Sequence, residues 1–417
     1  MAARRVQSAR TRHGVVIVGA NFAGLSAALA LPAAGDVVVV DPWPWFEWLP
    51  NIHELVSGVK RPSDLRLPRR EIVARAGHRF VRARVVAIDL RSRTLRLDDG
   101  QRLAFEHCLL AVGGINNDYG VPGAARNGMP FKSVADCAAI GSRLRRLASG
   151  AGRFAVVVVG GGFEGIEALG EVLRAYRHHP RIEIHLVERA DRLMPEGPRA
   201  VDAIVRRRVD GLPVRIHCAQ RVTRVTPRGV ALASGRTLAS DLTIWTGGAK
   251  APALLEGGGL ARSAAGWIQV RGDLSCHAAA GVFATGDVAD LPRPIAKQAY
   301  HAIDMGRHAA QNILRRVRGE KTLAFAPAPK PALVAFGDLD TFLITPSRVI
   351  SSPALAAAKE AVFQITIAGF DRLGSLAGLQ RASARGRQAL GELVLPTLHS
   401  LDAVTRVLSL RVADGAG

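Results

Sequence analysis

The chain has 417 residues, of which 48% are hydrophobic, 43 are glycines and only 5% are aromatic. This length exceeds one ordinary core and predicts two domains with an appendage, and the composition favours an α/β protein over a disordered or fibrous one. The formal charge of +21 comes from scattered basic residues, only seven of them lysines, with no dense basic block beyond residues 206–208. We attribute the charge mainly to compositional bias, rank an anionic membrane surface next, and expect no nucleic-acid partner.

The cysteines and the N-terminal residues further limit the kinds of site and location that we expect. Cys108, Cys137, Cys218 and Cys276 lie far apart and form no CxxC pair, so we expect neither a disulfide framework nor a metal site. Residues 1–12 are basic and contain no acid, and we interpret them as a flexible tail. No run of 18 apolar residues exists, so we expect no membrane-spanning helix.

Residues 14–41 have the pattern of a dinucleotide-binding βαβ unit. An apolar strand leads into a glycine turn, a helix of small residues follows, and the next strand ends at Asp41. The glycines permit the turn, the helix N-terminus faces a pyrophosphate, and Asp41 is placed to accept hydrogen bonds from an adenosine ribose. The turn departs from the usual fingerprint at its third residue, where a glycine is normal; its members are Gly19, Ala20, Asn21, Phe22, Ala23 and Gly24.

A second unit of the same kind begins about 140 residues later, at 154–188. Its turn has all three glycines, Gly160, Gly162 and Gly165, and its second strand ends at Glu188. A carboxylate at this strand end favours the ribose 2′-hydroxyl of NADH over the 2′-phosphate of NADPH. Arg189 and Arg192 follow closely and leave NADPH open. One such fingerprint is weak, but two complete units predict two bound dinucleotides.

Further motifs identify a resemblance to a known family. The segment PWPWFEWLPNIHELVSG after Asp41 has no cysteine, where disulfide reductases with two dinucleotide domains carry their redox pair. Together with HCLLAVGG, LTIWTGGAKAP and GVFATGDVADL, this segment resembles the flavoproteins with two dinucleotide-binding domains. Among them the chain is similar to type II NADH:quinone oxidoreductases and to apoptosis-inducing-factor-like, ferroptosis-suppressing NADH:ubiquinone reductases. The resemblance runs from about Gly14 to about Leu343.

The resemblance implies an α/β fold of two Rossmann-like domains, one for FAD and one for NAD(P)H, with the architecture of the pyridine nucleotide-disulfide oxidoreductases. We expect the FAD-binding domain at 13–122 and 247–325, interrupted by the NAD(P)H-binding domain at 123–246. Residues 326–417 would form a C-terminal capping region that also docks on a membrane.

Site residues are carried over from the family by their motifs. For FAD the resemblance implies the first glycine turn together with Asp41, Pro42, Pro50, Val85, Ala111, Gly113, Gly286, Asp287, Lys297 and Gln298. Asp287 would contact the ribityl-phosphate region of the flavin. For NAD it implies Gly160, Gly162, Phe163, Glu164, Gly165, Glu188, Gly247 and Gly248.

Lys297 and Gln298 open a segment, IAKQAYHAIDMG, that resembles the helix start of the ferroptosis-suppressor branch. We expect Pro294 in the first helical turn and the helix N-terminus pointing at the pyrimidine edge of the flavin, where negative charge develops. Lys297 would then stabilise that charge, and Gln298 would assist at the same edge. The alternative is that Lys297 only caps a helix toward solvent.

Glu167 is the other catalytic candidate, on the first turn of the helix after the second glycine turn. The resemblance implies that it lies near nicotinamide and flavin, where it orders the hydride donor or relays a proton. For Glu164 a favourable interaction with the helix dipole is explanation enough. We expect Glu171 to be solvated.

The C-terminal region begins with a proline-rich linker up to Pro331 and a small sheet. Helices are expected at 354–370 and 398–412, the second with Leu398, Leu401, Val404, Leu408 and Val412 on one face. The family resemblance favours contact of such a face with lipid over packing on a partner subunit.

The function hypothesis is an FAD-dependent NADH dehydrogenase that passes hydride to FAD and then two electrons to a quinone, without a redox-active disulfide or proton pumping. A cytoplasmic protein, peripheral on the membrane, is expected, and a homodimer stays open. One alternative is a soluble NAD(P)H reductase that uses ferredoxin or oxygen. Another is an apoptosis-inducing-factor-like binding protein that senses NADH and whose basic surface meets nucleic acid.

Overall fold

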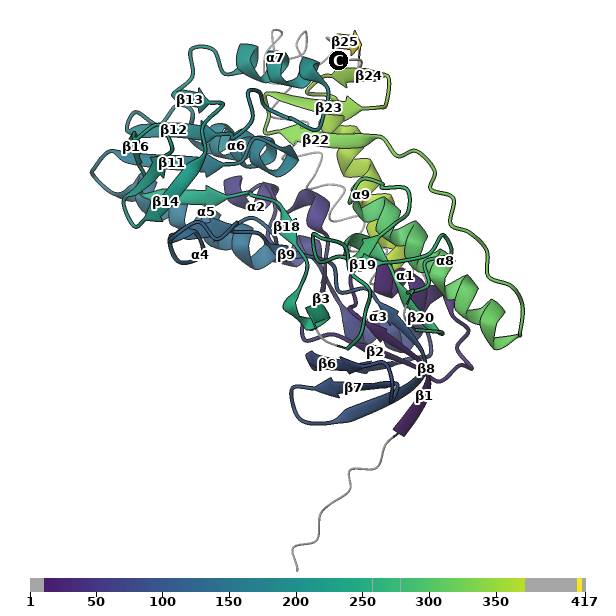
Figure 1. The fold of residues 1–417 in the computed structure, drawn as a ribbon. Coiled ribbons are helices and arrows are strands. Elements are labelled where there is room, and N and C mark those ends of the chain that lie inside the picture. Colours follow the sequence, from purple (N-terminus) through teal and green to yellow (C-terminus); the bar gives the residue numbers. More distant parts are fainter. Residues whose placement is uncertain (1–10, 257, 278, 372–410, 415–417) are drawn as a thin grey trace, which may run out of the picture. The chain divides into compact units, whose positions relative to one another are not determined.

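The computed structural model describes residues 11–256, 258–277, 279–371 and 411–414 (Figure 1). It divides the chain into two compact units. Unit 1 comprises residues 1–47, 66–115 and 249–329, and unit 2 comprises residues 48–65, 116–248 and 330–417. The segment Trp48–Leu65, which the sequence interpretation assigned to the first nucleotide domain, belongs to unit 2. The C-terminal part from Lys330 onward also belongs to unit 2.

Unit 1 is built on a seven-stranded sheet whose central strands are parallel. Its path is β5-β2-β1-β8-β7-β6, with β20 paired to β8. Where β1 pairs with β2 and with the end of β8, residues 15–18, 37–40 and 108–110 are apolar and buried, as expected for a parallel sheet covered on both faces. The strands are β1 (Thr11–Val18), β2 (Val37–Val40), β5 (Arg79–Val81), β6 (Val85–Asp89), β7 (Thr94–Leu97), β8 (Arg102–Leu110) and β20 (Val282–Ala284).

Two long helices, α1 (Phe22–Ala30) and α8 (Ala299–Val317), pack against each other in unit 1 (Figure 1). Gly306 permits this close packing, because a Cβ there would lie 2.1 Å from the carbonyl oxygen of Ala23. The remaining short elements of unit 1 are β3 (Trp45–Glu47), β4 (Arg66–Pro68), α3 (Arg69–Arg75), β18 (Ala249–Lys250), η3 (Ala253–Glu256), β19 (Ile268–Gln269), η4 (Gly286–Val288) and β21 (Ala289–Asp290). Strand β9 (Ile115–Asn116) straddles the boundary in the chain.

Unit 2 contains a parallel sheet of order β10-β17-β11-β12-β13 and two antiparallel sheets. The parallel strands are β10 (Gly128–Pro130), β11 (Phe154–Val159), β12 (Ile182–Val187), β13 (Val214–His217) and β17 (Leu242–Trp245). One antiparallel sheet consists of β14 (Val222–Thr226), β15 (Gly229–Leu232) and β16 (Thr237–Ala239). The other consists of β22 (Ala332–Phe336), β23 (Asp340–Ile344), β24 (Arg348–Ser351) and β25 (Arg411–Asp414).

The helices of unit 2 bring segments distant in sequence together. Gly141 lets helix α5 approach α2, because a Cβ there would meet the carbonyl oxygen of Leu55 at 2.5 Å. Gly170 likewise lets α6 approach the turn after β22, where its Cβ would lie 2.4 Å from the backbone nitrogen of Gly337. The helices are η1 (Leu49–Asn51), α2 (Glu54–Ser57), η2 (Pro62–Leu65), α4 (Ala124–Asn127), α5 (Val134–Ser149), α6 (Phe163–Tyr176), α7 (Arg199–Arg208) and α9 (Leu355–Asp371).

The structure corrects the start of one expected helix. Helix α8 begins at Ala299, and Gln298 before it is extended, so Pro294 is not in its first turn. Pro292 and Pro294 lack backbone N–H groups and favour an extended chain before the helix. Most of the helix expected at 398–412 lies outside the described residues, and its last two residues belong to strand β25. The helix expected at 354–370 is confirmed as α9. No helix among the described residues is long and apolar enough to cross a membrane.

Candidate functional site

The first glycine turn of unit 1 leaves no room for side chains at its ends. Gly19 has φ +96° and a Cβ there would lie 2.3 Å from the carbonyl oxygen of Ala111. A Cβ on Gly24 would lie 1.8 Å from the carbonyl oxygen of Gly19. Only glycine fits both positions, so β1 and α1 meet closely and the N-terminal end of α1 is open to a ligand.

The second glycine turn, in unit 2, repeats this geometry. Gly160 has φ +107°, and a Cβ on Gly165 would lie 1.9 Å from the carbonyl oxygen of Gly160. In contrast, no atom lies within 4 Å of the position that a Cβ on Gly162 would take. This open space beside the backbone at the start of α6 is the cradle that a pyrophosphate requires.

The acid at the end of each second strand holds its own glycine turn. Asp41 accepts hydrogen bonds from the backbone N–H of Ala20 at 2.8 Å and of Trp43 at 2.9 Å. Glu188 accepts from the backbone N–H of Gly161 at 2.6 Å and of Ala190 at 2.7 Å. Both carboxylates are buried, and Asp41 Oδ1 also accepts from the buried Arg69 guanidinium. The other oxygen of Asp41 and the oxygens of Glu188 each have a lone pair left for a further donor such as a ribose hydroxyl.

Asn21 stands where the second unit has Gly162. It is the N-cap residue of α1, and its side-chain oxygen accepts a hydrogen bond from the backbone N–H of Glu47 at 3.2 Å. The departure from the glycine pattern therefore ties the turn to strand β3. The Asn21 side chain is therefore held in place by a hydrogen bond within unit 1.

The other residues expected to hold FAD fall into three groups. Gly113 and Gly286 have φ +63° and +72°, and the Cβ position of Gly113 is open. Backbone at Gly113 can therefore approach a ligand, which fits a flavin nucleotide. Phe22, Ala23, Val85 and Ala111 are buried beside the sheet. Pro42 lies in unit 1, whereas Pro50 lies on η1 in unit 2.

Lys297 and Gln298 lie just before α8 in unit 1. The Lys297 ammonium donates to the backbone carbonyl of Asp287 in η4 and lies 3.6 Å from the centre of the Trp267 ring. Desolvation lowers the pKa of Lys297, although Asp287 and Asp290 act in the opposite direction. The side chain is thus held against η4 by a hydrogen bond and a cation–π contact.

Helix α6 carries the nicotinamide-side candidates of unit 2. Phe163 is 42% exposed at its first position. Glu164 forms a partly exposed ion pair with Lys132 at 2.5 Å in addition to its place at the helix N-terminus. Gly247 and Gly248 follow β17, and the carbonyl of Gly248 accepts from the backbone N–H of Asn117 at 3.1 Å.

Glu167 faces the interior of unit 2 rather than solvent. Its Oε1 accepts from the Lys359 ammonium on α9 at 2.5 Å and from the backbone N–H of Ala335 on β22 at 3.3 Å. His53 Nε2 lies 3.6 Å from the same oxygen. Because Lys359 also donates to His53 Nε2 at 2.9 Å, a neutral His53 carries its hydrogen on Nδ1.

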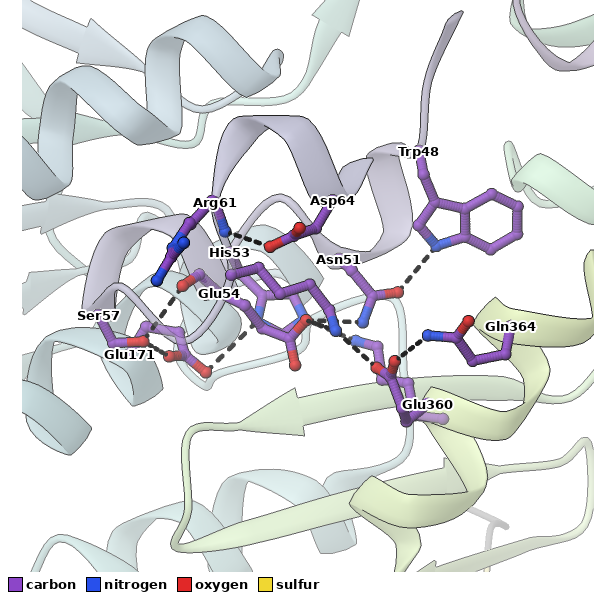
Figure 2. Close-up of polar contacts among 12 residues, drawn as sticks. Trp48, Asn51, His53, Glu54, Ser57, Arg61, Asp64, Glu171, Glu360 and Gln364 are labelled. Atoms are coloured by element: carbon purple, nitrogen blue, oxygen red, sulfur yellow. Dashed lines mark hydrogen bonds and ion pairs between the residues drawn. The ribbon is translucent and has the colours of Figure 1, made fainter. Parts of the chain in front are cut away.

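Glu171, expected to be solvated, is completely buried. It lies one helical turn after Glu167 on the face of α6 that packs toward α2. Its Oε1 is 3.4 Å from His53 Nδ1, and its Oε2 accepts from the Ser57 hydroxyl. Figure 2 shows Glu171 beside His53 and Ser57. The Arg174 Nε lies 3.6 Å from the same carboxylate, so the charge is compensated inside the unit.

A second buried ion-pair group adjoins the first (Figure 2). The Lys60 ammonium lies 2.8 Å from Glu360 and 3.6 Å from Glu54. Burial opposes ionisation of Glu54, but Lys60, His53 and the hydrogen bond from Asn51 outweigh it, so the pKa of Glu54 is lowered. Burial raises the pKa of Glu360, whereas Lys60, itself largely desolvated, has its pKa raised by the two carboxylates.

His53, Lys359, Lys60 and Glu360 were missed as site residues at the sequence level. Each is a charged or titratable residue in an otherwise apolar stretch, NIHELVSGVK or ALAAAKEAVF. That composition is a local signal of burial with a partner. The composition of these stretches does not show, however, that residues about 300 positions apart in the chain contact each other.

The cysteines support chemistry without a disulfide. All four are free, and burial raises the pKa of Cys108 and, to about 12, that of Cys276. Such thiols stay protonated and unreactive at neutral pH.

Two glycine turns of the same geometry, each at the start of a helix and each held by a terminal acid, define a flavin- and nicotinamide-dependent oxidoreductase. The pyridine nucleotide-disulphide oxidoreductase family model matches residues 13–306, and the chain belongs to this family. It is an FAD-dependent NAD(P)H oxidoreductase of the two-Rossmann-domain fold.

The relatives of the chain include enzymes named as quinone reductases. The chain is 24% identical to the demethylphylloquinone reductase of Synechocystis, over 84% of this chain and 91% of that protein. It is 23% identical to the type II NADH:quinone oxidoreductase of Staphylococcus epidermidis, over 91% of this chain and 100% of that protein. Among solved structures, NDH2 of Plasmodium falciparum has the same fold, with a TM-score of 0.79, 13% identity, and coverage of 91% and 98%.

Proposed function

We propose that the protein is an NADH dehydrogenase that passes electrons from NADH through FAD to a quinone. Its cofactors are FAD and NADH. When bound, FAD accepts a hydride from NADH and passes two electrons to the acceptor. The observation that carries the proposal is the bonding of Glu167 to Lys359 and its approach to His53, on the helix that follows the second glycine turn.

Unit 2 binds and orders NADH in this proposal. The open space beside Gly162 accommodates the pyrophosphate at the start of α6. Glu188 accepts from the ribose and disfavours a 2′-phosphate. Arg192, which would otherwise attract that phosphate, donates to the backbone carbonyls of Met194 at 2.6 Å and Pro195 at 2.8 Å.

In unit 1, Asp41, the first glycine turn, Gly113, Gly286 and Asp287 hold the flavin nucleotide. Lys297, fixed by the carbonyl of Asp287, supplies positive charge for the edge of the ring where negative charge develops. Gln298 is the N-cap residue of α8, and its side chain makes no hydrogen bond to the helix end. The first backbone N–H groups of α8 therefore face the same edge of the ring, and Gln298 assists there.

Quinone reduction consumes protons, since NADH, a quinone and one proton give NAD⁺ and a quinol. Glu167 is 14% exposed, whereas His53 and Glu171 are closed off from solvent. We therefore assign the exchange of a proton with the surroundings to Glu167, whose carboxylate the Lys359 ammonium holds in place.

The acceptor is apolar, and α9 offers a surface for a bilayer. Its exposed side chains include Ala358, Ala361, Val362 and Ile365, the last 75% exposed. Such a surface, on a protein with a formal charge of +21, favours peripheral docking on an anionic membrane at its cytoplasmic side.

The test compares Glu167→Gln with Glu183→Gln in FAD-loaded protein. Both variants remove one carboxylate from unit 2, but Glu183 is half exposed and pairs with Arg215 away from the glycine turn. We expect Glu167→Gln to lower turnover with a short-chain quinone at least tenfold with unchanged flavin content, and Glu183→Gln to stay within about twofold. Equal turnover in the two variants would reject the role of Glu167.

A further inference from the structure

A cationic cleft lies in unit 1 at the C-terminal end of α8, away from the glycine turn. Its volume is about 400 Å³, and it lies between the end of α8, the turn before β7, strand β8 and the segment before β20. Arg93, Arg316, Lys321 and His107 line it, and Glu320 is its only lining carboxylate among the described residues.

The positive charge of this cleft is not neutralised from within. Glu320 forms an ion pair at 3.1 Å with Arg315, which does not line the cleft. Asp273, whose pKa Arg316 helps to lower, is bound to the hydroxyls of Ser275 at 2.5 Å and Thr322 at 2.6 Å. The lining therefore keeps three permanent cations against one carboxylate that is already paired.

The arginine groups still have donors to offer. The Arg316 guanidinium lies 5.6 Å from the centre of the Phe283 ring, and its Nε has no hydrogen-bond partner among the described residues. Arg93 donates only to neutral backbone carbonyls, those of Glu106 at 3.0 Å and Ala280 at 2.5 Å, in the part of the chain that the structure describes. A guanidinium has five N–H donors, so both arginines can bind an anion as well.

Arg93 is kept in an unfavourable backbone conformation. Its φ is +49°, in the left-handed region that favours glycine. The turn between β6 and β7 thus retains a long cationic side chain where glycine would relieve the strain. Strain of this kind persists where the side chain has a task.

His107 adds a switchable donor to the lining. Burial lowers the pKa of His107, and Arg93 and Arg316 lower it further, so the ring is neutral at pH 7. Glu106 and the backbone of Gly281 act in the opposite direction. A bound anion would offset the two arginines and so favour the protonated ring.

We propose that the cationic cleft binds a phosphate group, carried by a small phosphorylated molecule with one or two phosphates. Two guanidinium groups and an ammonium match the oxygens of a phosphate, and arginine binds them in a bidentate manner. The volume suits a small ligand rather than a macromolecule. The site is separate from both glycine turns and holds neither electron donor nor acceptor.

The experiment titrates the FAD-loaded full chain with inorganic pyrophosphate by calorimetry, and separately measures binding to neutral vesicles with and without phosphatidic acid. The test variant is Arg316→Gln with Lys321→Gln. The matched control is Arg318→Gln together with Lys330→Gln, which removes two charges outside the cleft. Arg93→Gln serves as an independent variant if the first does not fold.

We expect saturable pyrophosphate binding that weakens at least tenfold in the test variant and within twofold in the control. Binding to phosphatidic-acid vesicles alone, with the same dependence on the variants, would support the cleft as a lipid-headgroup site. The proposal is overturned if neither probe binds saturably, or if the control loses as much affinity as the test variant.

Discussion

Replacing Lys359 by methionine tests the buried network of unit 2 most sharply. The change keeps the length and apolar stem of the side chain but removes the ammonium that bonds to Glu167 at 2.5 Å and to His53 at 2.9 Å. Glu167, 14% exposed, then retains the backbone N–H of Ala335 at 3.3 Å. Removing one partner of a buried ion pair costs about 3–5 kcal/mol. Because Glu167 keeps the hydrogen bond from Ala335 and some exposure to solvent, we expect a loss at the lower end, about 3 kcal/mol in the free energy of unfolding.

Urea unfolding of the FAD-loaded protein measures this loss. Adding Glu167→Gln removes the uncompensated charge, so the double variant should recover about 2 kcal/mol of it, as contacting residues are strongly coupled. The reasoning is refuted if Lys359→Met costs less than about 1 kcal/mol, or if the losses of the two single variants simply add.

Three further predictions concern a pH dependence and the two cofactor sites. The lowered pKa of Glu54 means that its ionised form stabilises the fold above its unfolded pKa of about 4.3, and that this is lost as the pH falls through the lower folded value. The stability difference between the protein and Glu54→Gln should therefore be full at neutral pH and vanish in acid; a constant difference would contradict the assignment. Gly162→Ala should leave folding intact, because its Cβ meets open space, but raise the KM for NADH at least tenfold, while Gly152→Ala, equally open, changes neither. Lys297→Ala should keep the flavin bound and slow quinone turnover severalfold, with recovery in Lys297→Arg; unchanged turnover would reject a role for its charge.

The parts of the fold that depend on local pattern could be predicted from the sequence. The glycine turns, and the acids after them, obey steric rules that operate over a few residues, such as the contact between Gly165 and the Gly160 carbonyl. The βαβ units and helix α9 followed from the same short-range patterns.

The predicted start of α8 was wrong, because a proline fits both the first helical turn and the extended chain before a helix. Local sequence cannot separate these, and the contact of Lys297 with the Asp287 carbonyl depends on a segment ten residues away. The prediction that Glu171 is solvated was wrong for a related reason. A carboxylate on a helix is normally solvated, and only the approach of Ser57, His53 and Arg174 from elsewhere allows its burial.

The buried network itself could not be predicted, because its members come from three distant segments. Lys359 and Glu167 are 192 residues apart, and Lys359 and His53 are 306 apart. Each looked like an isolated charge in an apolar stretch. Pairing them requires the packing of α2, α6 and α9, which no local pattern contains.

The central claim is most directly tested by stopped-flow spectroscopy of the flavin absorbance. The FAD-loaded protein is first mixed with NADH and then, in separate experiments, with a short-chain quinone or with air-saturated buffer. We expect rapid bleaching by NADH and rapid recovery with the quinone, much faster than with oxygen. Rapid bleaching followed by slow recovery with both acceptors would contradict quinone reduction while leaving the nicotinamide site intact.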